Sequence, residues 1–183
     1  LVGEQRIVVW DPAARRQVCV CRVPNGRILD MAFSPDGRQI AAVGGPDGEQ
    51  PGDVTLFDLA TGRPADRFPA HAKIASAVAF SPDGRRLITG SADATAIVWE
   101  LAGHEKKLVL QDKDKQHVGQ IRSVHFTPDG RQVLVGYFGD AILWNASTGA
   151  KVREFGDCNA AAFSRDGRVL AGWLGQRVVS YDR

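Results

Sequence analysis

Apolar and polar residues alternate in short runs along the chain, and helical periodicity is absent throughout. The alternation is clearest in the segment IRSVHF, where Ile121, Val124 and Phe126 are the apolar anchors of a buried strand. Gly- and Asp-containing turn signals follow such runs. The pattern therefore predicts an all-β chain made of many short antiparallel strands.

A turn string recurs four times and divides the chain into similar units. In this string proline fixes φ, aspartate hydrogen-bonds the local backbone, and glycine relaxes the exit of a type I turn. Four short strands with their turns need about 40 to 45 residues. The copies are FSPDG at Phe33–Gly37 and Phe80–Gly84, FTPDG at Phe126–Gly130 and FSRDG at Phe163–Gly167, at spacings of 47, 46 and 37 residues.

A second signal, an aromatic residue followed by a polar one, trails each turn string. A period of about 43 residues holding four strands is typical of a β-propeller blade. The endings after the four turn strings are TLFD at Asp58, IVWE at Glu100, ILWN at Asn145 and VSYD at Asp182, and a fifth, VVWD at Asp11, precedes the first string. With strands lettered a to d from the channel outward, we expect one propeller segment: strands c and d in 1–23, blades in 24–68, 69–111 and 112–155, and a partial blade in 156–183.

These residues resemble the WD-repeat family of β-propellers over essentially the whole chain. In that family a histidine, a strand serine or threonine, a turn aspartate and the tryptophan form a hydrogen-bonded network inside each blade. In the second unit His71 lies nine residues before Phe80, and Asp93 lies six residues before Trp99. The resemblance implies structural blade networks that use His71, Thr89 or Ser91, Asp93 and Trp99 in the second unit, and His117, Asp140 and Trp144 in the third.

The units also depart from the family pattern. Ala70 replaces the glycine before His71, and Asp140 lies at a shifted spacing from Trp144. The first unit carries an insertion, Gly44–Asp53, whose Gly and Pro content predicts a long surface loop. Because the family typically closes at about seven blades, the resemblance implies that the chain is part of a larger ring. Left alone, the segment would expose strand edges and an apolar blade face that favour self-association.

Composition and charge narrow the classes of partner. Apolar residues make up 44% of the chain, and 23 basic residues nearly balance 21 acidic ones. This balance gives no reason to expect a nucleic-acid or membrane surface, and no apolar run reaches the roughly 18 residues that span a bilayer. Cys19 and Cys21 lie two apart on an expected strand, so we predict reduced, half-buried thiols. Such cysteine usage agrees with a cytoplasmic location.

Candidate catalytic groups are isolated from one another in the sequence. We expect His104 to be a solvated turn residue, His125 to be a packed or channel-lining strand residue, and Cys158 to occupy a core position. No zinc-ligand spacing, phosphate-binding loop or nucleophile elbow occurs. We therefore expect no catalytic residue, no cofactor and no metal site.

The resemblance implies a non-catalytic scaffold whose loops, at one mouth of the propeller channel, bind a protein or peptide partner. Aromatic and arginine side chains dominate the energetics of such interfaces. The candidate contacts lie before the innermost strands and on the turns between strands b and c. They are Arg27, Lys73, Gln120, Arg122, Tyr137, Phe138 and Trp173.

Other functions stay open at this point. The propeller could carry or gate the active site of a hydrolase or redox enzyme, or regulate a fused signalling enzyme such as a protein kinase. A nucleic-acid surface would need Lys106, Lys107, Lys113 and Lys115 on one face, and the acids interleaved with them argue against it. Similarity to bacterial WD-repeat proteins rich in Ala, Gly and Arg implies a bacterial source.

Overall fold

The computed structural model describes residues 5–23, 27–45, 50–112, 120–156, 161–164, 169–174 and 177–182. These residues form strands and turns and contain no helix, which confirms the expected all-β class. Accordingly, the part of the chain that the structure describes holds no helix able to cross a membrane.

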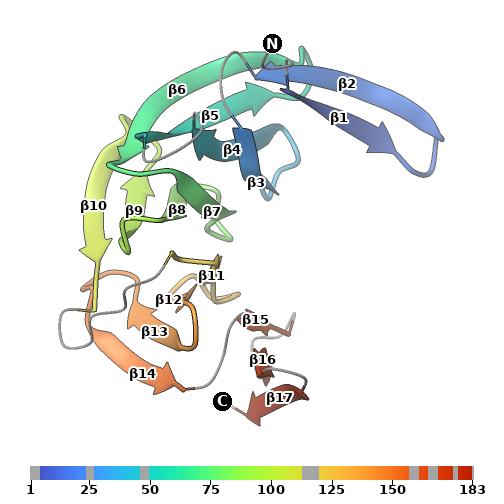
Figure 1. The fold of residues 1–183 in the computed structure, drawn as a ribbon. Helices are drawn as coiled ribbons and strands as arrows, with labels where there is room; N and C mark the ends of the chain where they lie inside the picture. The colour runs from blue at the N-terminus through green and yellow to red at the C-terminus, as the bar shows by residue number, and fades with distance from the viewer. Residues whose placement is uncertain are drawn as a thin grey trace.

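Five antiparallel sheets follow one another along the chain and form an arc (Figure 1). The first holds β1 (Gln5–Asp11) and β2 (Arg16–Val23). The second holds β3 (Arg27–Phe33), β4 (Gln39–Gly45), β5 (Gly52–Asp58) and β6 (Arg63–His71). The third holds β7 (Ala75–Phe80), β8 (Arg86–Ser91), β9 (Ala96–Glu100) and β10 (Glu105–Leu110), and the fourth holds β11 (Ser123–Phe126), β12 (Gln132–Gly136), β13 (Ala141–Asn145) and β14 (Lys151–Phe155). The last holds β15 (Ala161–Phe163), β16 (Val169–Leu174) and β17 (Arg177–Asp182).

The three four-stranded sheets are propeller blades, with their strands hydrogen-bonded in chain order from a to d. Their a strands β3, β7 and β11 lie on the inner side of the arc, and the d strands β6, β10 and β14 lie on the outer side (Figure 1). The first sheet supplies strands c and d, and the last supplies a, b and c. Four-stranded antiparallel blades are therefore confirmed, and we call the three complete ones blades 1, 2 and 3.

Each aromatic-plus-polar ending marks the end of a c strand. β1, β5, β9, β13 and β17 end at the polar residue that the pattern identified, from Asp11 to Asp182. The ring of Phe57 is buried at the end of β5, as are Trp99 on β9 and Trp144 on β13. In the three complete blades the aromatic side chain thus anchors the c strand in the core, and the polar residue after it begins the turn to strand d.

Local hydrogen bonds explain why the turn string has the same sequence in each blade. In blade 2, Ser81 Oγ donates to Asp83 Oδ1 at 2.6 Å, and the same carboxylate accepts the Arg85 N–H at 3.1 Å. The Gly84 N–H donates to the Ser81 carbonyl at 2.9 Å, and Gly84 has a φ of +70°, which favours glycine. Because these contacts need Ser or Thr, Asp and Gly at fixed positions, the string recurs in every complete blade.

The core lies between adjacent sheets rather than inside one. One cluster joins Ile88 and Val98 of blade 2 to Val124 and Ile142 of blade 3, and a second joins blades 1 and 2 in the same way. A polar contact adds to this packing, because the Arg86 guanidinium donates to the Gly130 carbonyl at 2.8 Å and lies 5.3 Å from the Phe126 ring. Each complete blade therefore buries its apolar face against a neighbour, as in other repeat proteins.

The loop formed by the insertion in the first unit is shorter than expected. Gly44 and Gly45 complete β4, and Gly52 and Asp53 begin β5, so the expectation of a loop over the whole of Gly44–Asp53 is wrong. The two ends pair directly, with Gly44 opposite Asp53. At Gly44 a β-carbon would lie 1.7 Å from the Arg27 carbonyl oxygen, so this glycine is needed for a close backbone approach inside the sheet.

Candidate functional site

A hydrogen-bonded chain of four side chains links the end of β6, the outer strand of blade 1, to blade 2. His71, at the end of β6, places Nε2 2.8 Å from Thr89 Oγ1 on β8, and Trp99 Nε1 on β9 donates to the same oxygen at 2.9 Å. On the other side of the ring, His71 Nδ1 lies 3.2 Å from Asp93 Oδ2. The structure thus brings together the histidine, hydroxyl, carboxylate and indole that the sequence pattern pointed to.

The direction of donation along this chain is fixed by its two ends. The indole N–H of Trp99 can only donate to Thr89 Oγ1, and the Asp93 carboxylate can only accept from His71 Nδ1, so Nε2 of the neutral ring accepts from the Thr89 hydroxyl. This leaves the ring proton on Nδ1, where the Asp93 carboxylate accepts it. Every polar atom in the chain then has a partner of the right kind, which fixes the histidine tautomer and holds the end of β6 against β8 and β9.

Asp93 is the anchor of the network. Its carboxylate also accepts the Thr95 hydroxyl at 2.6 Å, the Thr95 N–H at 2.9 Å and the Ala72 N–H at 3.2 Å. Partial burial opposes ionisation, yet the hydrogen bonds from His71 and Thr95 outweigh it and hold the pKa of the Asp93 carboxyl well below its usual value of 3.8. Folding therefore favours the ionised carboxylate.

This shift predicts how stability changes with pH. Because the pKa of Asp93 is lower in the folded than in the unfolded chain, its contribution is fully present above pH 3.8 and is lost as the pH falls toward the folded value. We expect Asp93→Asn to be less stable at neutral pH and to lose less stability than the parent between about pH 5 and pH 3. Urea unfolding at several pH values in this range measures how the free energy of unfolding of each protein changes with pH. The same change in both proteins would refute the role of Asp93.

Ser91 has a different place from the one that the sequence suggested, and Thr95 belongs to the network although the sequence did not indicate it. Thr89, and not Ser91, bridges the histidine and the tryptophan. Ser91 Oγ instead donates to the carbonyls of Ile74, at 3.0 Å, and Lys73, at 3.3 Å, and so holds the connection before β7. Thr95 was missed, although its oxygen lies 3.1 Å from His71 Nδ1. Its only sequence signal is a hydroxyl residue two positions after the turn aspartate.

Blade 3 keeps the tryptophan without its hydroxyl partner. Trp144 pairs with Val133 and Ile142 with Val135, so Val135 occupies the place that Thr89 has in blade 2. Within the described residues the buried Trp144 Nε1 has no hydrogen-bond partner. Asp140 accepts the Tyr137 N–H through its backbone carbonyl, at 2.7 Å. His117 lies outside the described residues, so the network expected in this blade stays a prediction.

An exposed aromatic and a cation form a pair on the loops of blade 3. Phe138, on the turn between β12 and β13, is 69% exposed, and the Arg122 guanidinium lies 5.6 Å from its ring centre. Arg122 precedes β11, where its backbone N–H donates to the Gly136 carbonyl at 2.8 Å. The structure thus brings these two candidate contact residues together on one surface.

The other candidate contacts are distributed differently. The Tyr137 side chain is buried with the core of blades 2 and 3, so the expectation that it contributes to a binding surface is wrong. Side chains alternate between the two faces of β12, and Tyr137, just after its end, lies on the same face as Val133 and Val135. The next residue, Phe138, points away from that face. Gln120 and Lys73 are half-buried and Arg27 is exposed. The side chain of Trp173 lies outside the described residues.

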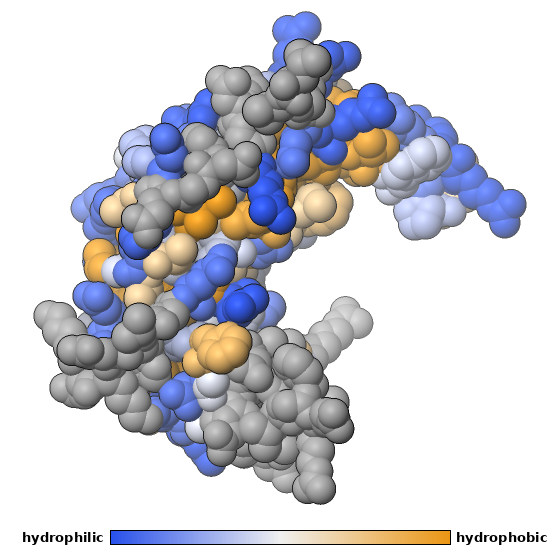
Figure 2. All heavy atoms as spheres, viewed as in Figure 1, coloured by the Kyte–Doolittle hydropathy of each residue, from blue (hydrophilic) through white to orange (hydrophobic). Residues whose placement is uncertain are grey.

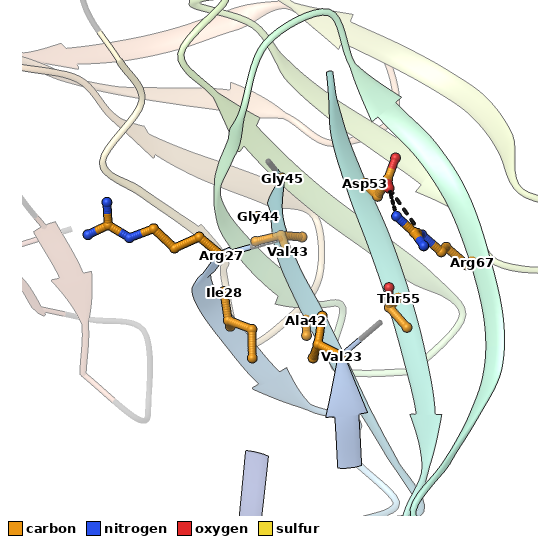
Figure 3. A pocket seen from close by; sticks show the side chains of 10 residues that line it. All are labelled: Val23, Arg27, Ile28, Ala42, Val43, Gly44, Gly45, Asp53, Thr55 and Arg67. Atoms are coloured by element: carbon orange, nitrogen blue, oxygen red, sulfur yellow. Dashed lines mark hydrogen bonds and ion pairs between the residues drawn. The ribbon is translucent and has the colours of Figure 1, made fainter. Parts of the chain in front are cut away.

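A small pocket lies on blade 1 beside Arg27. Figure 3 shows that the Arg27 side chain points away from it, while Asp53 and Arg67 form an ion pair along one wall. The pocket holds about 20 Å³, room for roughly one water molecule. Ligand sites need roughly 300 Å³ or more, so this pocket does not accommodate an organic ligand.

His104 is not the solvated turn residue that the sequence suggested. It lies in the turn between β9 and β10, but its ring stacks on Phe68 of β6 at 4.5 Å, and its Nε2 lies 2.7 Å from Asp66. Phe68 also lies 5.1 Å from Trp99. The histidine therefore helps to hold the outer strand of blade 1 against blade 2, a contact that its sequence neighbours do not reveal.

The remaining titratable groups do not converge. His125 is half-buried on β11, and burial lowers its pKa, opposed by the charge of Asp30. Cys19 and Cys21 are free thiols, half-buried and buried respectively, and burial raises the pKa of Cys21 to about 12. Cys158 lies outside the described residues. Among the residues that the structure describes, no group of three His, Cys, Asp or Glu side chains is placed to hold a metal ion.

Comparison with known proteins finds the same repeat. The family model described as "WD domain, G-beta repeat" matches residues 62–100, the segment that holds the His71 network. A Protein LST8 homolog from Drosophila melanogaster is 33% identical over 96 residues, covering 51% of this chain and 31% of that protein.

Two further relatives extend the similarity along the chain. An uncharacterized WD repeat-containing protein from Synechocystis is 30% identical over 138 residues, which cover 75% of this chain and 37% of the relative. A guanine nucleotide-binding protein subunit beta from Zea mays is 25% identical over 177 residues, which cover 91% of this chain and 45% of the relative. The chain thus spans less than half the length of each protein named here. Since the repeat, the blades and the relatives agree, the chain belongs to the WD-repeat family.

Proposed function

We propose that the chain is a non-catalytic scaffold that binds a protein or peptide partner through the loops beside its inner strands. The observation that carries the proposal is the pair formed by Phe138, which is 69% exposed, and Arg122. Exposing a phenylalanine on a turn has no folding benefit, whereas aromatic and arginine side chains supply much of the energy of protein interfaces. We call the surface formed by Gln120, Arg122 and Phe138 the loop face.

Several features support this proposal over an enzymatic one. His71 and Asp93, a histidine and a carboxylate in contact, are both engaged by blade residues on their remaining polar sides. The relative from Zea mays is named as a subunit of a guanine nucleotide-binding protein, which makes it one member of an assembly. A cytoplasmic location and a bacterial source remain predictions from the sequence.

A comparison of variants tests the loop face. We expect the double variant Arg122→Ala, Phe138→Ser to lose a protein partner captured by the parent chain from the cells that make it. The control is Val109→Ser, which removes an exposed apolar side chain from the outer strand β10. Quantitative mass spectrometry of the three captures measures the effect, expected to be about tenfold or more because two interface anchors are removed. Equal capture by all three proteins would contradict the proposal.

A further inference from the structure

Two cysteine side chains lie side by side on β2, the outer strand of the first sheet. Cys19 and Cys21 are two positions apart, so they point to the same face of the strand. The Cys21 thiol donates a hydrogen bond to the sulfur of Cys19. The two sulfur atoms are therefore in contact, and neither belongs to a disulfide.

The pair lies in an apolar seam between the first sheet and blade 1. Cys21 is fully buried in a cluster that includes Ile7 of β1 and Phe57 of β5. Cys19 is half-buried at the margin of this cluster, beside Gly62 in the turn between β5 and β6, where an added β-carbon would lie 3.4 Å from Cys19 Cβ. Figure 2 shows hydrophobic side chains gathered where the first sheet meets blade 1, at the N-terminal end of the arc. Cys19 is thus the accessible end of the pair.

Blade packing does not require a thiol at either position. Cys21 lies opposite Ile7, and the residues at its place on the outer strands of the complete blades are large, apolar and buried: Phe68, Leu110 and Phe155. Cys19 lies opposite Val9, and the residues at its place share no chemical type: Asp66, Leu108 and Arg153. The paired thiols therefore distinguish the first sheet from the three complete blades.

The geometry of the two thiols limits what they can bind. Neighbours on one face of a strand have Cα atoms about 6.6 Å apart and nearly parallel Cβ vectors, which disfavours a disulfide between them. A structural zinc ion takes four protein ligands, and the described part of the chain has no group of three His, Cys, Asp or Glu side chains placed together. Monovalent copper is a soft ion that prefers thiolates and accepts as few as two ligands. Two sulfur atoms in contact at the end of an apolar seam therefore suit Cu(I).

We propose that Cys19 and Cys21 form a two-thiolate binding site for Cu(I). Each thiol releases its proton to the solvent and each sulfur forms one bond to the ion, so the copper stays monovalent and the complex has one net negative charge. The half-buried side chain of Cys19 admits the ion and keeps this charge near water, which limits the cost of burying it. Burial raises the pKa of the Cys21 thiol to about 12. Because this proton must leave, the affinity for Cu(I) rises with pH.

An anaerobic titration with the coloured complex of Cu(I) and bicinchoninate tests this site. We expect the 183-residue chain to withdraw one copper ion per chain, measured as a loss of the absorbance of the complex. Cys19→Ser changes the half-buried member of the pair and leaves Cys21 as a single ligand, so it is expected to weaken binding by about a hundredfold or more. Cys158→Ser is the matched control, since it removes the third cysteine of the chain and keeps the pair. Circular dichroism checks that each variant is folded.

The possible outcomes separate this site from its alternatives. One copper ion per chain in the parent and in Cys158→Ser, with binding weakened in Cys19→Ser, supports the site. No uptake by the parent, equal uptake by all three proteins, or a loss in Cys158→Ser overturns it. One copper ion per two chains, with a dimer in sedimentation, means that a second copy supplies a ligand and also overturns it.

X-ray absorption at the copper edge is a second test that needs no variant. The copper-loaded parent is expected to show sulfur ligands. A shell of nitrogen or oxygen alone would overturn the proposal even if Cys19→Ser failed to fold. The loop-face double variant should take up copper like the parent, so failure of this proposal is distinguishable from failure of the proposed scaffold function.

Discussion

Replacing Thr89 with valine is expected to lower the free energy of unfolding of the chain by about 3 kcal/mol at neutral pH. The substitution keeps the shape of the side chain but removes the hydroxyl that links His71 Nε2 to Trp99 Nε1. Both nitrogens are buried, and each would lose its partner without gaining water. Urea unfolding followed by tryptophan fluorescence measures the loss.

Two further variants separate the hydroxyl from packing. Thr89→Ser keeps the hydrogen bonds and removes one buried methyl group, which costs about 1 kcal/mol. Val135→Thr adds a hydroxyl at the equivalent place in blade 3, beside Trp144 Nε1, which has no partner among the described residues. We expect it to change stability by less than about 1 kcal/mol, since the new hydroxyl offers Trp144 an acceptor. If Thr89→Val and Thr89→Ser cost the same, the network contributes nothing beyond packing.

Gly44→Ala is expected to destabilise the chain by about 3 kcal/mol or more. A β-carbon at this position would lie 1.7 Å from the Arg27 carbonyl oxygen and 3.2 Å from the Ile28 Cα, and both of these atoms belong to the backbone. Neither atom can move without disturbing the pairing of β3 with β4, where Ile28 lies opposite Gly44. Thermal unfolding followed by circular dichroism measures the effect as a lower midpoint.

The matched control for this steric argument is Gly156→Ala. The nearest atom to a β-carbon there is Asp140 Oδ1 at 3.8 Å, an ordinary contact. Because alanine restricts the unfolded chain more than glycine does, this variant is expected to be neutral or more stable by up to about 1 kcal/mol. A Gly44→Ala protein as stable as the Gly156→Ala protein would show that the close approach of Arg27 is not required.

The sequence predicts those parts of the fold that depend on local contacts. The turn that contains Ser81, Asp83 and Gly84 is closed by hydrogen bonds between residues at most five positions apart. It can therefore be predicted from its local sequence alone. The ends of the c strands in the complete blades follow from the same reasoning, since there the aromatic residue is buried and the next residue begins a turn. Short strands joined by turns at this spacing then form four-stranded antiparallel blades.

Contacts between blades could not be read in the same way. His104 stacks on Phe68, a residue 36 positions earlier, and nothing in its neighbourhood in the sequence indicates that partner. Gly44 and Gly45 have the composition of a loop, but the approach of the Arg27 backbone makes glycine suitable inside the strand. Tyr137 and Phe138 are adjacent aromatic residues, and only the direction of β12 decides which one is buried.

The His71 network and the loop face have complementary places in the scaffold. The network ties the end of β6 in blade 1 to β8 and β9 of blade 2 through buried hydrogen bonds, and Ser91 ties the connection before β7 to blade 2. Because the core lies between blades, the register of blade 2 also determines the packing surface for blade 3. The turn that carries Phe138 is therefore held by a rigid neighbour, which lowers the entropic cost of binding a partner.

The most direct test of the scaffold is to map where a partner binds. A peptide is first selected from a random display library for binding to the purified chain, and amide hydrogen exchange is then compared with and without it. We expect added protection in residues 120–122 and 137–140, with no change along β10 and β14. Protection confined to the outer strands, or failure of the library to yield any binder, would contradict it.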